Sequence, residues 1–252
     1  MTHLRIATLL IAPAAAMMIS ACSKEVVEPP PSTTCDALPP WPANIDAILF
    51  DDFERPNQLG LGRPISGTSW TLYGPDTITR GRIENGAYTA GPPMGPPGNL
   101  VYAATFVEKA PDIMVAHFNF VTTTNSGGTD GGIAILTTTD PPPGKLWKNM
   151  LHLSITTGTW VLTVYRNGVP HLLSTGTSAG VFNLVPDGRT YNLFMQVKGD
   201  EVQLYLPTGE IVQACDPEVS DVHGNQLIFE HIYTNQSVHY GRFDLVGAFL
   251  NP

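Results

Sequence analysis

From residue 45 onward, apolar and polar residues alternate in short segments bounded by Gly, Pro, Asn and Asp. A period of two is typical of strands with one buried face, and no helical period longer than two turns is present. No internal repeat recurs at a fixed spacing. The segments predicted to be strands are residues 45–53, 69–73, 77–83, 87–90, 100–106, 113–122, 132–138, 150–156, 160–165, 170–174, 191–197, 201–206, 211–214, 227–233 and 238–249.

Several of these segments are joined by residue pairs that favour tight turns. Asn85-Gly86 and Asn167-Gly168 suit type I′ turns, which need a positive φ at both central residues. Gly199-Asp200 and Thr208-Gly209 favour similar bends. With 24 Gly, 23 Pro and only 14% charged residues, the pattern predicts an all-β fold, a two-sheet antiparallel jelly-roll sandwich spanning residues 45–252.

Residues 1–21 have the order of a cleavable signal peptide. Arg5 precedes an apolar run over residues 6–19 that is too short for a spanning helix, and Ile19-Ser20-Ala21-Cys22 follows. The last four residues resemble the lipobox of bacterial lipoproteins, which implies that Cys22 carries fatty acyl groups such as palmitate. We therefore expect a membrane anchor in a bacterial cell envelope, with the protein facing the periplasm or the exterior. An ordinary signal peptide is the alternative.

Residues 22–44 are rich in proline and lack apolar periodicity, which predicts an extended tether. The whole chain has a net charge of −9, and removal of the signal peptide takes away Arg5 alone, so the mature chain is more acidic by one unit. Such a charge disfavours nucleic acid as a partner. The sequence holds no phosphate loop or dinucleotide fingerprint, so we expect no nucleotide either.

With Cys22 acylated, Cys35 and Cys215 are the remaining cysteines. A compartment outside the inner membrane tolerates disulfides, so we predict that these two residues pair. Two separate thiols remain the alternative, because no spacing rule links the two positions.

Two stretches resemble a known superfamily. Phe50-Asp51-Asp52-Phe53-Glu54-Arg55, then Trp70 and Arg82-Ile83-Glu84-Asn85-Gly86, are similar to the entry strands of concanavalin A-like jelly rolls, the lectin, glucanase and laminin-G-like group. The segment 191–206 is similar to that group's late paired strands, although Pro207-Thr208-Gly209 replaces an Asp-Gly turn. The resemblance implies that the final strand returns beside the first, and it supports the fold better than any activity.

Strand alternation separates apolar from polar faces in several predicted strands. If these strands are neighbours, their polar residues share one sheet surface, the concave one on which jelly rolls of this group bind glycans. A merely solvated outer face is the alternative. The candidate ligand-binding residues are His117, Asn119, His152, Ser154, Thr163, Tyr165 and Gln196.

Trp147 lies between two lysines in a proline-rich loop, where it could stack on a sugar ring. The alternative is that Trp147 covers a sheet edge or one end of the core, because tryptophan buries most of its surface in most settings. Trp70 and Trp160 have apolar neighbours and are predicted to be core residues.

The sequence supports an enzyme less well. The E-x-D-x-x-E strand that places acid and nucleophile together in glucanases of this group is absent. Lyases of the same fold use His, Tyr, Arg and Gln to remove a proton beside a uronate, and His117, His152, Tyr165 and Arg82 are the matching residue types. The motifs of those lyases, Gln-x-His and Tyr-x-Lys-x-Gly, do not occur.

The resemblance also implies a structural calcium ion where the first and last strands meet, with Asp51, Asp52 and Asp244 as the matching positions. Protection of a sheet edge by acidic residues is the alternative. No other cofactor is expected.

The leading hypothesis is therefore a membrane-anchored, non-catalytic lectin-like module that binds a polysaccharide or glycoconjugate. A polysaccharide-degrading lyase or hydrolase and a structural envelope protein with a protein partner are the alternatives.

Overall fold

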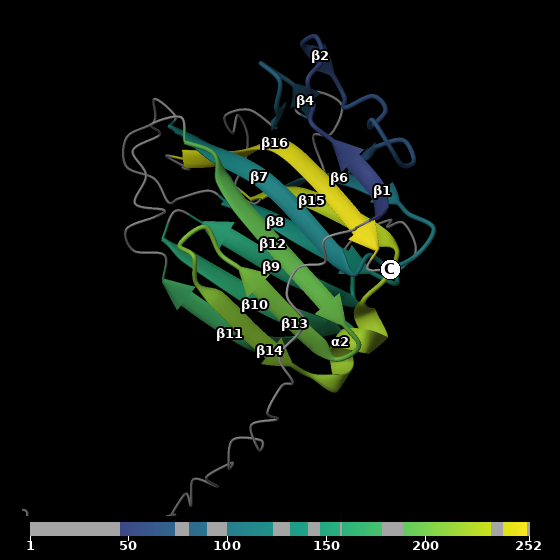
Figure 1. Ribbon diagram of the computed structural model, residues 1–252, viewed down its shortest axis with the longest axis vertical. Coiled ribbons are helices and arrows are strands. Elements are labelled where there is room, and N and C mark those ends of the chain that lie inside the picture. Colours follow the sequence, from purple (N-terminus) through teal and green to yellow (C-terminus); the bar gives the residue numbers. More distant parts are fainter. Residues whose placement is uncertain are drawn as a thin grey trace, which may run out of the picture. The chain divides into compact units, whose positions relative to one another are not determined.

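The structure is a computed structural model that describes residues 46–73, 81–89, 100–122, 132–140, 147–156, 158–177, 189–232 and 239–250. These residues belong to one compact unit, Thr33–Pro252. They form two antiparallel β-sheets that face each other (Figure 1). The predicted all-β, two-sheet antiparallel jelly-roll sandwich is confirmed. The predicted signal peptide and the predicted tether, with Cys22 and Cys35, lie outside the described residues.

The nine-stranded sheet has the order β14-β13-β12-β7-β16-β5-β4-β2, and β1 also pairs with β16. Its strands are β1 (Asp46–Asp51), β2 (Gln58–Leu59), β4 (Arg82–Ile83), β5 (Tyr88–Thr89), β7 (Ile113–Thr122), β12 (Tyr191–Lys198), β13 (Glu201–Tyr205), β14 (Ile211–Cys215) and β16 (His239–Leu250). The pairing of β1 with β16 confirms that the final strand returns beside the first.

The seven-stranded sheet has the order β11-β10-β9-β8-β15-β6-β3. Its strands are β3 (Thr71–Tyr73), β6 (Leu100–Phe106), β8 (Gly132–Thr138), β9 (Met150–Thr156), β10 (Thr159–Arg166), β11 (Val169–Thr177) and β15 (Gln226–Ile232). The strands predicted at 100–106, 113–122, 132–138 and 150–156 coincide with β6, β7, β8 and β9. The short strand β2 was not predicted.

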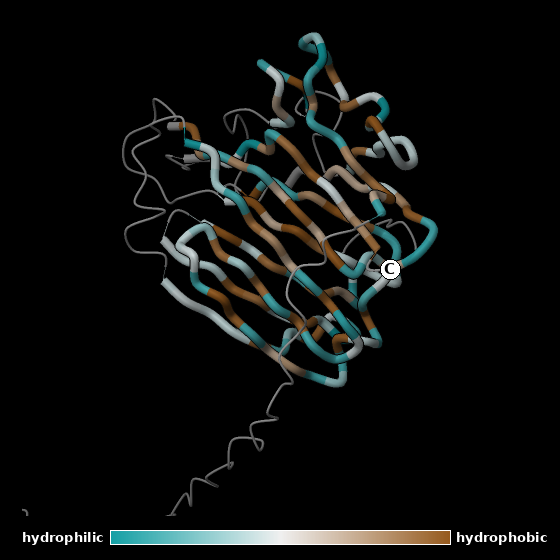
Figure 2. The backbone as a smooth tube through the Cα atoms, in the orientation of Figure 1, coloured by the Kyte–Doolittle hydropathy of each residue, from teal (hydrophilic) through white to brown (hydrophobic). Residues whose placement is uncertain are grey.

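The main core lies between the two sheets, and the alternation of hydrophobic and polar residues along the strands can be followed in Figure 2. Trp70 and Trp160 are buried in it, as predicted. Both predicted type I′ turns are confirmed, because Asn85, Gly86, Asn167 and Gly168 all have a positive φ.

One helix, α2 (Pro217–Val222), occurs among the described residues, and sequence periodicity did not predict it. Its signal is local: Asp216 caps the helix by accepting a hydrogen bond from the Glu218 N–H, and Pro217 occupies the first turn. Val219 and Val222 point into the core, so α2 closes one end of the sandwich. No helix in the described part of the chain is both long and apolar enough to cross a membrane.

Candidate functional site

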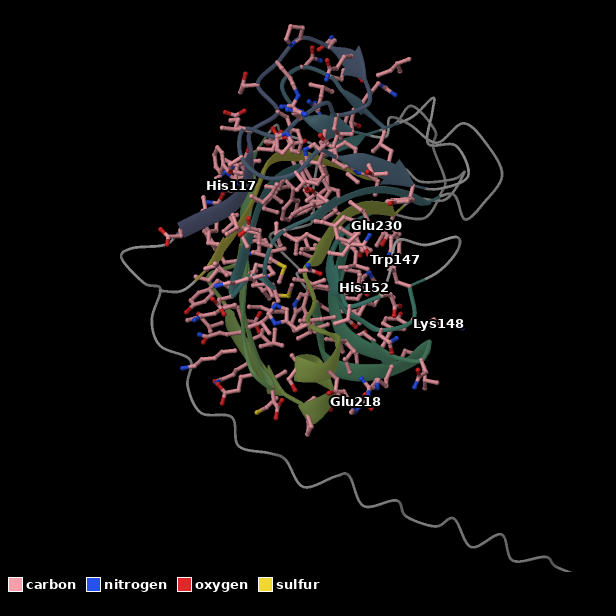
Figure 3. All side chains as sticks on the ribbon, turned by 90° about the vertical axis from the view of Figure 1, so that its right-hand side faces the viewer. His117, Trp147, Lys148, His152, Glu218 and Glu230 are labelled. Atoms are coloured by element: carbon pink, nitrogen blue, oxygen red, sulfur yellow. The ribbon has the colours of Figure 1, made fainter. Side chains whose placement is uncertain are left out.

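The predicted polar residues divide between the two sheets. His117 and Asn119 lie in β7 and Gln196 in β12, whereas His152, Ser154, Thr163 and Tyr165 lie in β9 and β10. Their strand neighbours fill the core between the sheets, so the two sets point outward in opposite directions, and Figure 3 places His117 on one side and His152 on the other. The prediction of one shared surface is therefore wrong.

The outer face of the seven-stranded sheet carries a histidine beside a carboxyl group. His152 in β9 pairs with Leu136 of β8, and Glu230 in β15 pairs with Ala134 of the same strand. The small side chain of Ala134 leaves room above β8, and the two longer side chains meet there, with 3.8 Å between His152 Nε2 and Glu230 Oε2. Figure 3 shows both residues on this side of the sandwich.

Burial holds both groups in their uncharged forms near neutral pH. It raises the pKa of Glu230 to about 8 and lowers the pKa of His152 to about 4. The separation is within ion-pair range, but removing two charges from water costs more than their attraction returns here. His152 Nε2 is buried without a hydrogen-bond partner, and burial without a hydrogen-bond contribution accounts for the raised pKa of Glu230. The pair therefore has unused hydrogen-bonding capacity.

Further polar side chains surround this pair. Thr163 of β10 lies directly opposite His152, and the Tyr165 ring packs edge-on against the imidazole at 5.9 Å between centroids. Ser154, two residues along β9, is half-buried on the same face. Hydroxyl groups, an imidazole and a carboxyl group thus lie together in a partly enclosed setting, a composition suited to ligands rich in hydroxyl groups.

Trp147 covers the other part of this face. Its side chain is 5% exposed and packs in a second apolar cluster with Ala104, Leu136 and Ile228. Its indole N–H donates to Gln226 Oε1 at 3.2 Å, while Gln226 Nε2 has no partner. The structure therefore matches the alternative in which Trp147 covers the sheet, and a freely exposed stacking platform is excluded for this conformation.

Asp140 fixes the turn that follows Trp147. Its carboxylate accepts hydrogen bonds from the backbone N–H groups of Lys148 and Asn149 and from the Asn149 side chain. Burial opposes ionisation of Asp140, but these hydrogen bonds and the charge of Lys148 outweigh it and lower its pKa. The bonded carboxylate thus fixes the position of the two residues that follow Trp147.

The outer face of the nine-stranded sheet holds a separate polar cluster. Asn119 donates to both oxygens of Asp244, at 3.1 and 2.9 Å, and Thr190 donates to Oδ2 of the same carboxylate at 3.0 Å. Burial raises the pKa of Asp244 and lowers that of His117. Gln196 is buried on this sheet with its Oε1 unpaired. In this cluster the Asp244 carboxylate is already occupied by donors from the protein.

The proposed catalytic set is not assembled. Arg82 lies in β4 and pairs with Glu84, with 2.8 Å between Arg82 Nε and Glu84 Oε2. Arg82 and His117 therefore belong to the nine-stranded sheet, whereas His152 and Tyr165 belong to the other. A single lyase centre built from these four residues is wrong.

The proposed calcium ligands do not converge either. Both carboxylate oxygens of Asp51 are taken by protein donors: Phe53 N–H and Arg55 Nη1 bond Oδ1, and Arg55 Nη2 and Trp70 Nε1 bond Oδ2, at 2.6 to 3.1 Å. Asp51 is fully buried beside the core residue Trp70, whereas Asp244 bonds Asn119 on the outer face of the nine-stranded sheet. Asp52 bonds the Glu54 N–H nearby. These residues do not fit a calcium ion, and Asp51 instead fixes Arg55 and Trp70.

Cys215 ends β14 and is disulfide-bonded. Its expected partner, Cys35, lies outside the described residues, so the pairing stays a prediction.

Glu230 was not among the site residues predicted from the sequence. A signal was present, because Glu230 interrupts the apolar run Leu227-Ile228-Phe229 of a predicted strand. A lone carboxylate in a buried strand has a high desolvation cost and is therefore informative.

No protein-family model matches the chain, and no curated protein sequence matches it. Several solved structures are similar to it in fold. The CBM2 module of the evolved Dit protein of Lactobacillus casei BL23 phage J-1 is 13% identical and has a TM-score of 0.53, with 82% of this chain and 97% of that chain covered.

Two carbohydrate-binding neighbours have the same fold. The carbohydrate recognition domain of Emp46p, as a mutant, is 13% identical with a TM-score of 0.50, covering 71% of this chain and 86% of that chain. The exoplasmic/lumenal domain of VIP36, in a form bound to Ca²⁺ and Man3GlcNAc, is 10% identical with a TM-score of 0.50, covering 73% and 83%. At these identities the likeness establishes the concanavalin A-like fold.

Proposed function

We propose that the protein is a lipid-anchored, non-catalytic module of a bacterial cell envelope that binds a polysaccharide or glycoconjugate. The binding site is the outer face of the seven-stranded sheet around His152 and Glu230. The observation that carries the proposal is the buried His152 Nε2, which has no hydrogen-bond partner and lies 3.8 Å from the Glu230 carboxyl group. Buried polar groups without partners are rare in folded proteins, and sugar hydroxyls both donate and accept, so a bound glycan would satisfy them.

The fold supports the same proposal. The neighbours include a carbohydrate-binding module and lectin domains, which makes sugar binding a reasonable use of this scaffold. Tyr165 beside His152 adds an aromatic ring, whose face suits the C–H surface of a pyranose.

A polysaccharide array probed with the full chain in detergent tests the proposal, followed by calorimetric titration of each hit. His152→Ala, which removes a hydrogen-bonding group, and Tyr165→Ala, which removes the aromatic ring, are each expected to weaken binding roughly tenfold. His117→Ala, on the opposite face, is the matched control and is expected to leave affinity unchanged. Loss of binding with His117→Ala but not with His152→Ala would move the site to the nine-stranded sheet. A blank array together with a protein partner captured by crosslinking would overturn glycan binding.

The lipid anchor is tested separately. The N-terminal peptide of the mature protein is expected to carry acyl groups on Cys22, as mass spectrometry would detect. Cys22→Ser is expected to release the chain from the membrane fraction. An unmodified Cys22 would contradict the anchor without bearing on glycan binding.

One observation favours a second function, cleavage of the bound polysaccharide. A protonated carboxyl group and a neutral imidazole 3.8 Å apart can act as an acid and a base. Burial alone raises the pKa of Glu230, with no contribution from a second carboxylate among the described residues, so the two-carboxylate chemistry of glycosidases lacks support. Release of unsaturated or reducing ends from an array hit, abolished by His152→Ala, would establish the enzymatic alternative.

A further inference from the structure

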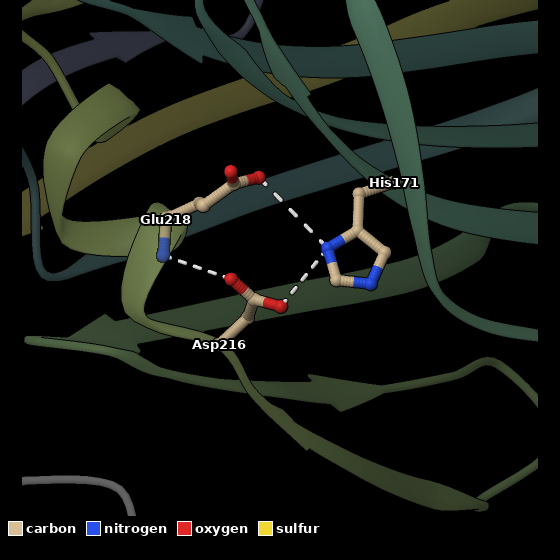
Figure 4. A group of neighbouring side chains, drawn as sticks. All are labelled: His171, Asp216 and Glu218. Carbon is tan, nitrogen blue, oxygen red and sulfur yellow. Dashed lines mark hydrogen bonds and ion pairs between the residues drawn. The ribbon is translucent and has the colours of Figure 1, made fainter. Parts of the chain in front are cut away.

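Three potential metal ligands meet where the two sheets end. His171 lies in β11, an edge strand of the seven-stranded sheet. Asp216 and Glu218 follow β14, an edge strand of the nine-stranded sheet. Asp216 Oδ2 is 3.1 Å and Glu218 Oε2 is 3.8 Å from His171 Nδ1 (Figure 4). Among the described residues this is the one group of His, Cys, Asp and Glu whose donor atoms all lie within 4.8 Å of one another.

The spacing suits a small divalent ion. A tetrahedral zinc ion with bonds of about 2.1 Å separates its ligand atoms by about 3.4 Å. The separations of His171 Nδ1 from Asp216 Oδ2 and Glu218 Oε2, 3.1 and 3.8 Å, lie on either side of this value. An ion pair explains the contact between His171 and Asp216, but it does not require a second carboxylate aimed at the same nitrogen.

The neighbouring structure leaves the required atoms available. Asp216 uses Oδ1 to cap α2 by accepting from the Glu218 N–H at 2.8 Å, which fixes its side chain and leaves Oδ2 directed at His171. His171 and Glu218 are partly exposed, so an ion can reach the group and keep water in a further coordination position. One imidazole and two carboxylates suit zinc, whereas calcium and magnesium prefer a shell of oxygen atoms alone.

We propose that His171, Asp216 and Glu218 form a binding site for a divalent transition-metal ion of the zinc class. A bound ion would link β11 to the turn between β14 and α2, and so tie the edge strands of the two sheets together. The edge strands β11 and β14 already lie in contact, so binding needs no large rearrangement. The site does not overlap the proposed sugar-binding face. His171 pairs with Val164 of β10, a core residue, so its side chain lies on the core side of the sheet, whereas Thr163 and Tyr165 point outward.

Thermal unfolding of the full chain, purified without a polyhistidine tag and freed of metal by a chelator that is then removed, tests the site. Zinc at about 100 times its dissociation constant is expected to raise the Tm by roughly 5 to 10 °C. The same concentration of calcium or magnesium is expected to raise it much less. Cobalt, bound in place of zinc, is expected to give visible absorption bands of a low-coordinate site, a readout that general stabilisation does not produce.

Three variants and one control assign the ligands. His171→Ala and Glu218→Gln each remove one ligand and are expected to weaken zinc binding at least roughly tenfold. Asp216→Asn is expected to do the same while keeping the helix cap, because asparagine caps as well as aspartate. Asp221→Asn is the matched control: it lies on the same helix and is exposed, but its partner is Arg166. This control is expected to bind zinc as the wild type does.

The proposal is overturned if zinc fails to raise the Tm, or if His171→Ala responds to zinc as the wild type does. It is also overturned if zinc binding requires two chains, which sedimentation with and without zinc would detect, because the site is built within one chain.

Discussion

His152 Nε2 and Glu230 Oε2 lie 3.8 Å apart on one sheet face, and burial shifts their pKa values in opposite directions, toward the neutral form of each. An exposed pair of this kind would ionise and attract. Here the side chains reach each other over Ala134, in a setting where charge is costly. The face therefore offers uncharged hydrogen-bonding groups, which suit a neutral sugar better than a fixed charge would.

The pH dependence of stability follows from these directions. The pKa of Glu230 is raised to about 8, so its contribution to stability is full below the pKa of an unfolded glutamate and is lost as the pH rises toward 8. Between pH 5 and 8 we expect the wild type to lose about 2 to 4 kcal/mol relative to Glu230→Gln. Urea unfolding of both proteins across this range measures the difference. Parallel curves would mean that Glu230 is ionised in the folded protein.

The pH dependence of stability that His152 contributes has the opposite sign to that of Glu230. Its pKa is lowered to about 4, so its contribution is present above the pKa of an unfolded histidine and is lost as the pH falls through 4. His152→Gln is therefore expected to flatten the acid side of the stability curve and leave the alkaline side as it was. His231, also buried with its pKa lowered to about 3, remains in both proteins and cancels in the comparison.

Asp51 is expected to be among the most sensitive positions for stability. Asp51→Ala would leave Arg55 and the Trp70 N–H without their acceptor inside the protein, at a cost of about 3 to 5 kcal/mol. Asp52→Ala, which removes one exposed hydrogen bond, is expected to cost less than about 1 kcal/mol. Equal midpoints in urea for the two variants would contradict the buried network.

Gly224 is expected to tolerate no side chain. A Cβ at this position would collide with the backbone carbonyl of Thr138. The Thr137 hydroxyl also donates to the Gly224 carbonyl and accepts from the Gly224 N–H, which holds the backbone in place. Gly224→Ala should therefore destabilise the protein by about 2 to 4 kcal/mol. Gly158→Ala, where a Cβ meets nothing within 4 Å, is the control and is expected to be neutral. Calorimetric Tm values compare the two.

Trp147 is expected to matter through packing more than through its N–H. Trp147→Ala would uncover Leu136 and Ile228 and should cost about 3 to 5 kcal/mol. Trp147→Phe keeps an aromatic ring but loses the bond to Gln226, for about 1 to 2 kcal/mol. If Trp147→Ala unfolds at the wild-type urea concentration, the indole does not cover this face in solution.

The cysteine pairing gives a further test. Peptide mapping without reduction is expected to recover a crosslinked peptide containing Cys35 and Cys215. Cys35→Ser and Cys215→Ser should each destabilise by about 2 to 5 kcal/mol, and the double variant should add nothing more, because either change removes the same bond. A free Cys35 thiol would contradict the pairing.

Local patterns determined much of the fold. Alternation defined β7 and β9 to the residue, because each packs one face against the core and carries polar side chains on the other, whereas β8, predicted with the correct bounds, is buried on both faces. The turn residues Asn85-Gly86 and Asn167-Gly168 adopt the conformations that their chemistry favours. Helix α2 was not predicted, because six residues are too few to show a helical period; its local signal was the cap at Asp216 followed by Pro217.

The candidate site depended on the tertiary structure. The sequence by itself determined which residues face outward on each strand, since that follows from the pleat. It did not determine which strands are neighbours, because pairing depends on contacts between residues far apart in the chain. For that reason His117 and His152 were expected on one surface and lie on opposite ones, while Glu230, 78 positions after His152 in the numbering, is the residue that reaches it.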